Sequence, residues 1–206
     1  MIAKVININI ESYETALEYL ERVKDINKRF DLLLKYGQKF IAECPTKTQR
    51  VLNSFISQIL SMKKSGNDPL IKYENLIKIF INHESLLADL LDFIIISDEN
   101  CDSTILHRRI ELHLDKLAEE KKSNAITKDS TIDLITSLIK SKKYQNKIDK
   151  NYILMLFKMH NFTDGIVTLS EIMDLRQELL TIYMDNHKYD KIINVCENFG
   201  RPVIIF

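Results

Sequence analysis

The sequence contains little glycine, proline or cysteine, no tryptophan, and no excess of charge of either sign. Its 206 residues include four glycines and three prolines, and 29 basic residues balance 29 acidic ones. Few glycines and prolines, together with abundant leucine, isoleucine, lysine and glutamate, predict an all-α chain with tight connections. Isolated glycines also make a glycine-rich phosphate-binding loop hard to build. A formal charge of zero provides no global field that would recruit nucleic acid or anionic lipid.

The three cysteines, Cys44, Cys101 and Cys196, are odd in number and far apart, and none belongs to a Cys-x-x-Cys pair. This pattern indicates neither a zinc finger nor a disulfide framework, and it favours a reducing compartment. No apolar run reaches membrane-spanning length, and the first residues lack the apolar core and cleavage site of a signal peptide. We therefore expect a soluble, cytosolic, helical protein.

Residues 152–200 carry the clearest helical signal, because apolar residues recur there at helical spacing in four short segments. Two of the turns resemble each other: a histidine lies two residues before an aromatic residue, and an aliphatic residue lies four after it. The second set lies 27 residues after the first, from His160 to His187. Self-similarity at this spacing indicates stacked helical hairpins. The candidate repeat-turn residues are His160, Phe162, Gly165, His187 and Tyr189.

Helices are also expected in the rest of the chain, with connections of a few residues. Start and stop signals place them at about 12–23, 25–43, 45–60, 76–81, 83–96, 103–122 and 129–139. Ser12 and Ser103 are expected N-caps, and Pro45 suits the first turn of a helix. Gly37, inside a predicted helix, indicates a close helix crossing or a local break. Residues 152–159 are apolar nearly all round, which predicts an inner helix covered on every side.

We expect residues 11–200 to form one α-solenoid of stacked antiparallel helical hairpins. Residues 1–10 carry no helix-start signal, so their structure is left open. Residues 201–206 form an apolar tail that ends as if a solenoid had been cut between repeats, and we expect a truncation point there.

Candidate catalytic and metal-binding residues are few. His107 and Glu111 share a helix face, but His113 points elsewhere and no His-Glu-x-x-His motif occurs, so solvated or capping roles are favoured. Cys196 lies on the apolar face of its predicted helix, where a cysteine packs as a small hydrophobe rather than serving as a nucleophile. We expect no catalytic, cofactor-binding or metal site.

The charge distribution is more informative than the net charge. Residues 140–150 contain five lysines and one aspartate, whereas acidic residues dominate 161–190. A basic segment beside an acidic one can steer a partner or dock against another subunit, although solvated helix faces explain the same charges. Tyr144 is the single aromatic residue in the basic segment, which is too little for base stacking. The candidate basic interaction surface consists of Lys140, Lys142, Lys143, Lys147 and Lys150.

The last quarter of the chain resembles the C-terminal helical solenoid of the vacuolar protein sorting protein eleven family. The likeness rests on Met159-His160-Asn161-Phe162, Asp164-Gly165, Tyr183-Met184, His187, Tyr189, Ile193, Val195-Cys196-Glu197 and Gly200. Weaker similarity extends upstream to about residue 13.

The resemblance implies an α-solenoid of clathrin-heavy-chain or TPR-like repeats. It implies a non-enzymatic scaffold of the HOPS and CORVET tethering complexes, which act in endosome-to-vacuole or lysosome transport and membrane fusion. Expected partners are other subunits of the complex, with no cofactor, nucleic acid or small-molecule substrate. The expected location is cytoplasmic, peripheral on late endosome, vacuole or lysosome membranes, with membrane association through the complex.

Family members also carry an N-terminal β-propeller and a C-terminal RING zinc domain, and this sequence contains neither. We therefore expect a fragment of a longer protein, or a reduced version of one. Two alternatives remain open: another helical-repeat coat or pore scaffold, and a small helical enzyme or regulatory bundle.

Overall fold

The computed structural model describes residues 10–66, 71–72, 74–122 and 129–198. All regular structure in these ranges is helical, as predicted, and the chain divides into two compact units, residues 1–109 and 110–206. The predictions for segment 1–10 and tail 201–206 lie outside the described residues, apart from Ile10, the first residue of a helix.

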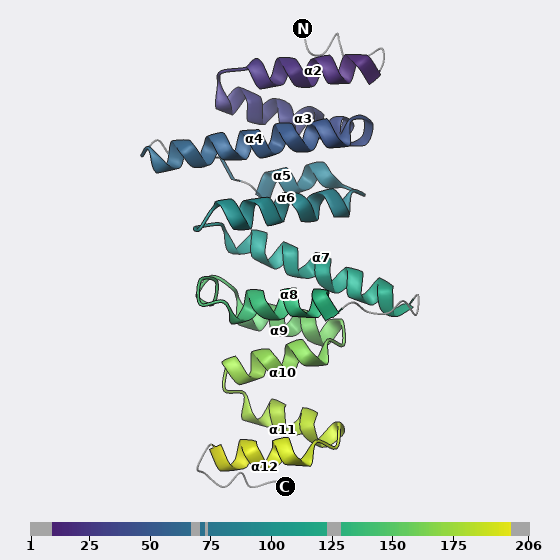
Figure 1. The fold of residues 1–206 in the computed structure, drawn as a ribbon, viewed down its shortest axis with the longest axis vertical. Helices are drawn as coiled ribbons and strands as arrows, with labels where there is room; N and C mark the ends of the chain where they lie inside the picture. Colours follow the sequence, from purple (N-terminus) through teal and green to yellow (C-terminus); the bar gives the residue numbers. More distant parts are fainter. Residues whose placement is uncertain (1–9, 67–70, 73, 123–128, 199–206) are drawn as a thin grey trace. The chain divides into compact units, whose positions relative to one another are not determined.

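In the first unit, successive helices run back and forth and stack in sequence order (Figure 1). They are α2 (Ile10–Arg22), α3 (Ile26–Glu43), α4 (Pro45–Lys64), α5 (Glu74–Ile77), the 3-10 helix η1 (Lys78–Phe80), α6 (Glu84–Ser97) and the first part of α7 (Ser103–Lys122). α2, α3 and α4 pack against one another, η1 packs on α3, and α6 packs on α4. The boundary between the units falls within α7.

The core of this unit is formed by apolar side chains from facing helices. Phe30 of α3 and Phe55 of α4 stack in parallel with ring centroids 6.1 Å apart. The buried Arg29 guanidinium closes the end of α2, because it donates to the carbonyl oxygens of Glu21 and Val23 and to the side chain of Gln58. Its donors therefore satisfy backbone acceptors that a helix end leaves unpaired.

The helix starts agree with the sequence in part. Pro45 occupies the start of α4, as predicted. Ser12 is not an N-cap, because α2 has already begun before it. The expected cap Ser103 is also wrong: Asp102 caps α7, and its Oδ1 accepts a hydrogen bond from the Thr104 N–H at 2.8 Å. Aspartate is as strong an N-cap as serine, so residue type alone does not show which of two adjacent residues, Asp102 or Ser103, caps the helix.

The second unit contains the rest of α7 and a further series of antiparallel helices. In chain order these are α8 (Asp129–Lys140), α9 (Lys150–Met159), α10 (Thr163–Ile172), α11 (Arg176–Asp185) and α12 (Tyr189–Asn198). α10 packs against α8, α9 and α11, and α12 packs against α11. Stacking of consecutive helical hairpins within each unit confirms the predicted all-α solenoid class.

α9 to α12 repeat with a regular period, since each has 10 residues and they begin at residues 150, 163, 176 and 189. The turns repeat as well: Asn161, Asp174 and His187 have φ of 51°, 56° and 54°. After each, the next N–H donates to the carbonyl five residues earlier, at 2.8–2.9 Å. This is the Schellman arrangement that closes a helix. The starts of α10 and α12 place the hairpin period at 26 residues, so His187 corresponds to Asn161 rather than to His160.

Candidate interaction surfaces

The predicted repeat-turn residues Phe162 and Gly165 lie together in the core. Phe162 is 4% exposed, and its ring meets that of Phe157 edge to face, with centroids 5.2 Å apart. Gly165 is buried directly against these two rings, with no space for a β-carbon. Both residues therefore fix the α9–α10 hairpin from inside and are not available to a partner.

His187 and Tyr189 lie together on the surface, and His160 lies apart from them. The His187 ring nitrogen is 3.3 Å from the Tyr189 hydroxyl. His160 is the C-cap residue of α9, and its Nε2 lies 3.9 Å from a carboxylate oxygen of Asp115 in α7. The histidines thus serve different contacts, which follows from their different positions in the repeat.

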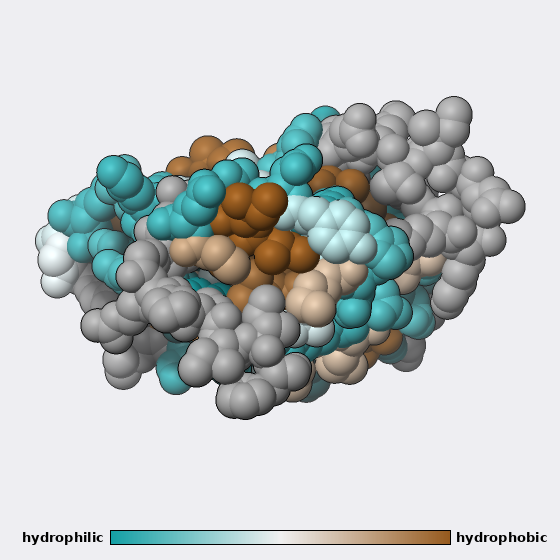
Figure 2. Space-filling model, turned by 90° about the horizontal axis from the view of Figure 1, so that it is seen from below, coloured by the Kyte–Doolittle hydropathy of each residue, from teal (hydrophilic) through white to brown (hydrophobic). Residues whose placement is uncertain are grey.

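The outer face of α12 carries exposed apolar side chains. Tyr189 is 63% exposed and Ile193 is 54% exposed, and Ile192, Val195 and Cys196 are half-buried. In α10, by contrast, Leu169 is completely buried. Figure 2, which views the molecule from the α12 side, shows apolar side chains gathered on this face. Contiguous exposed apolar groups of this kind mark interaction sites on protein surfaces.

The predicted basic surface runs from Lys140 at the end of α8, across a segment built of turns, to Lys150 at the start of α9. Lys140, Lys142 and Lys143 are exposed, whereas Lys147 and Lys150 are half-buried. The buried side chains of Tyr144 and Ile148 attach the segment to the unit. Its one aspartate, Asp149, caps α9: Oδ1 accepts hydrogen bonds from Asn151 N–H at 3.0 Å and Tyr152 N–H at 3.1 Å. The negative charge therefore lies at a helix N-terminus, and Lys140, Lys142 and Lys143 give the segment its exposed positive charge.

The prediction that residues 152–159 form a helix covered on every side is wrong. Ile153, Leu156 and Phe157 of α9 are buried, but Met155 is 49% exposed and Met159 is 68% exposed. The two methionines are four residues apart and form an apolar stripe on the outer face of the helix. The sequence analysis did not predict this stripe. The one sequence feature that marks it is methionine at these two positions, where the buried positions of the helix carry isoleucine, leucine and phenylalanine.

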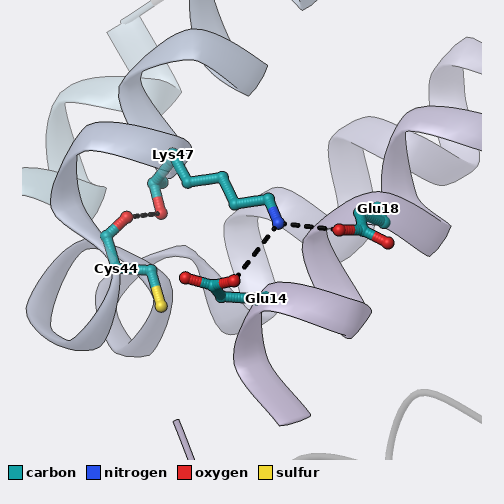
Figure 3. A network of polar contacts seen from close by, with 5 residues as sticks. Glu14, Glu18, Cys44 and Lys47 are labelled. Carbon is teal, nitrogen blue, oxygen red and sulfur yellow. Dashed lines mark hydrogen bonds and ion pairs between the residues drawn. The ribbon is translucent and has the colours of Figure 1, made fainter. Parts of the chain in front are cut away.

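A cluster of charged residues links α2 to α4 in the first unit (Figure 3). The Lys47 Nζ lies 2.8 Å from Glu18 and 3.6 Å from Glu14. The hydrogen bond from Lys47 and its positive charge lower the pKa of Glu18, and the same bond raises the pKa of Lys47. Burial, followed by the charge of Glu14, raises the pKa of the neighbouring Cys44 thiol. The thiol is thus protonated at neutral pH, and the cluster joins helices rather than activating a nucleophile.

The candidate metal ligands do not converge in the described part of the chain. Glu111 accepts a hydrogen bond from the Tyr152 hydroxyl at 2.6 Å, and His113 is buried. Across the described residues, no three His, Cys, Asp or Glu side chains gather as a metal site would require. Within the same ranges, no helix is both long and apolar enough to cross a membrane.

A cavity of about 660 Å³ lies where α4 and α6 end, lined among others by Leu60, Lys63, Ile96 and Asp98. Lys63 and Asp98 form an ion pair at 3.8 Å across it. Asp98 Oδ1 also accepts a hydrogen bond from the Asn100 N–H at 2.9 Å, which closes the turn after α6. The Asp98 carboxylate therefore holds the turn and the two helix ends together.

Comparison with known proteins identifies the kind of repeat. A family model described as PEP5/VPS11 clathrin repeat matches residues 1–205. The chain is 26% identical over 198 residues to the vacuolar protein sorting-associated protein 11 homolog of Mus musculus, and 25% identical to that of Homo sapiens, covering 94% of this chain in both. The homolog of Dictyostelium discoideum is 26% identical over 128 residues, which are 62% of this chain.

The chain spans 20% of the length of the mouse and human relatives and 13% of the Dictyostelium relative. No solved structure matches. The family model covers nearly every residue, and the helical hairpins seen in each unit are the architecture that a clathrin repeat describes. The chain therefore belongs to the PEP5/VPS11 clathrin repeat family.

Proposed function

We propose that this chain is a non-enzymatic scaffold segment of a vesicle-tethering complex that acts in endosome-to-vacuole or lysosome transport and membrane fusion. Membership of the PEP5/VPS11 family supports the proposal, as does the similarity to proteins named for vacuolar protein sorting. Its partners are other protein subunits of that complex. Its location is cytoplasmic and peripheral on late endosome, vacuole or lysosome membranes, reached through those subunits.

The observation that carries the proposal is the apolar face of α12. Stacked hairpins bury their apolar faces against neighbouring helices, as α10 does against α8, α9 and α11. Tyr189 and Ile193 carry the same kind of surface but are more than half exposed. Covering such side chains with a partner helix removes apolar area from water, which favours association by about 25 cal/mol per Å² before ordering costs.

The polar groups of the chain support a scaffold rather than an enzyme. The cavity at the ends of α4 and α6 holds Lys63 and Asp98 as an ion pair. Burial raises the pKa of the Cys44 thiol, which is opposite to what a nucleophile needs. An acid–base or nucleophilic mechanism requires groups whose pKa values are shifted toward neutrality within reach of one another.

Affinity purification from the cells that make the protein tests the proposal. We expect the tagged chain to co-purify with subunits of a tethering complex, identified by mass spectrometry. The variant Tyr189→Ser with Ile193→Asp should lose most of them. The matched control, Tyr19→Ser with Ile96→Asp, makes the same changes at exposed residues of the first unit and should keep them.

Two outcomes would contradict the proposal. Co-purification of a coat or pore complex instead would assign the repeats to a different scaffold. Full recovery of the tethering subunits by the α12 variant would show that its apolar face is not the binding surface.

A further inference from the structure

We infer that residues 140–159 form a second docking surface, which binds a partner protein segment that is acidic at one end and apolar along one helical face. The inference rests on the proposed function because it takes the chain to act by binding proteins. It concerns a different surface from α12, with its own residues and its own chemistry.

The acidic end of the partner is indicated by the charge of the segment between α8 and α9. Lys140, Lys142 and Lys143 are exposed within four positions of one another. Asp149, the one carboxylate of residues 140–150, is already hydrogen-bonded to the start of α9. Tyr144 and Ile148 are buried, so the lysines project from a fixed backbone rather than from a free chain. Such a fixed positive surface complements a negative one.

The apolar face of the partner is indicated by the methionine stripe of α9. Met155 and Met159 lie four residues apart, so they follow one face of the helix for about 6 Å. The helix that carries the stripe begins at Lys150, the last residue of the basic segment. The exposed lysines and the methionines thus belong to consecutive parts of one chain segment. Methionine adapts its shape to the partner and is over-used at binding surfaces for helical segments.

The side chains favour a protein partner over a lipid surface. Membrane-interface anchors are bulky residues such as Trp, Phe and Leu, and none of these is exposed on residues 140–159. The aromatic residue of the basic segment, Tyr144, is turned into the core, and Lys143 lies over its ring at 5.2 Å. Three exposed lysines without an inserted apolar anchor give weak, salt-sensitive attraction to anionic lipid.

Fluorescence anisotropy with the purified chain tests the inference. The probe is a fluorescein-labelled synthetic peptide with three glutamates followed by leucines at helical spacing over about three turns. Two control peptides carry glutamine for glutamate or serine for leucine. We expect the chain to bind the probe at low salt, to bind each control about tenfold more weakly, and to lose affinity as salt is added.

Variants locate the binding on the chain. Lys140→Glu, Lys142→Glu and Lys143→Glu together should weaken probe binding about tenfold or more, since three charge contacts are reversed. Lys24→Glu, Lys28→Glu and Lys39→Glu change the charge equally at exposed residues of the first unit and should leave it unchanged. Met155→Ser with Met159→Ser should also weaken binding about tenfold, while Leu34→Ser with Ile81→Ser should not. Circular dichroism confirms that each variant is folded.

Five outcomes separate this inference from its alternatives. Equal binding of the probe and both control peptides would overturn it, as would unchanged binding by the lysine variant. Lysine-dependent binding to phosphatidylcholine vesicles containing phosphatidylserine, without probe binding, would overturn it in favour of a lipid surface. Normal probe binding by Tyr189→Ser with Ile193→Asp would support a separate site. Failure of the native chain to bind the probe, with intact co-purification of tethering subunits, would overturn this inference and leave the proposed function standing.

Discussion

Gly37 of α3 and Ile79 of η1 are in direct contact, so that a β-carbon at residue 37 would lie 2.7 Å from the Cγ2 of Ile79. The neighbouring Gln38 side-chain amide donates a hydrogen bond to the Lys78 carbonyl oxygen at 3.0 Å. The contact is therefore both apolar and polar, and it holds η1 close to α3. The close crossing that an interior glycine predicts is present at this position.

Substitution of Gly37 by valine should lower the free energy of unfolding by about 1–3 kcal/mol, as overpacked sites do. Substitution by alanine should lower the free energy of unfolding less, because alanine favours a helix by about 1 kcal/mol relative to glycine. Urea denaturation of the purified chain measures both. Adding Ile79→Ala to Gly37→Val should restore part of the loss, and purely additive effects of the two changes would show that the residues do not compete for space.

Gly165 has a similar role in the second unit. A β-carbon there would lie 2.8 Å from the Phe157 Cδ2 and would also strike the ring of Phe162. Gly165→Val should therefore separate the edge-to-face pair and lower the free energy of unfolding by about 1–3 kcal/mol. Thermal denaturation followed by circular dichroism measures the change. An unchanged melting temperature would mean that the rings can move aside without loss.

The helical class and the hairpins could be predicted because the relevant signals are local. Apolar periodicity defines which face of a segment is buried, and proline at residue 45 fixes the start of α4 through its own φ. Similar turns near residues 160 and 187 revealed a hairpin repeat. The period was predicted one residue too long, because two histidines were aligned that occupy different backbone positions.

The surfaces were harder to predict because exposure depends on which helix lies opposite. Met155 and Leu156 are adjacent and similar in hydropathy, yet one is half exposed and the other buried. Tyr189 follows the apolar spacing of its helix, which is typical of a core residue, yet its side chain is largely exposed on α12 among the described residues. The basic segment was visible in the sequence. What the sequence did not indicate was that its one aspartate is engaged as the N-cap of α9.

His187 holds a left-handed backbone conformation that an L-residue adopts at a cost. Its φ is 54°, and the next N–H closes the Schellman turn. His187→Gly should raise the free energy of unfolding by about 0.5–1 kcal/mol. Glycine removes the left-handed strain, but the greater conformational entropy that it gives the unfolded chain offsets part of this stabilisation. Asn161→Gly should gain less, since asparagine tolerates this region better. A lower melting temperature for His187→Gly would instead show that the contact between His187 and Tyr189 outweighs the strain.

The Asp102 cap of α7 links the stability of the fold to pH. Hydrogen bonds from the Thr104 side chain and backbone lower the pKa of Asp102. A carboxylate whose pKa is lower in the folded state stabilises the fold above its unfolded pKa of about 3.9, and this stabilisation is lost as the pH falls through the folded pKa. Asp102→Ala should therefore lower the free energy of unfolding by about 1 kcal/mol at neutral pH.

The difference between the native chain and Asp102→Ala should narrow below about pH 4, because protonation removes the charge that the cap uses. Asp102→Asn keeps an acceptor oxygen that does not titrate, so its stability difference from Asp102→Ala should persist into acid. Asp31→Ala, at an exposed residue within α3, controls for loss of one carboxylate. Urea denaturation at a series of pH values measures all four proteins. A gap between the native chain and Asp102→Ala that stays constant from neutral pH to pH of about 3 would show that the charge of Asp102 contributes nothing to the cap.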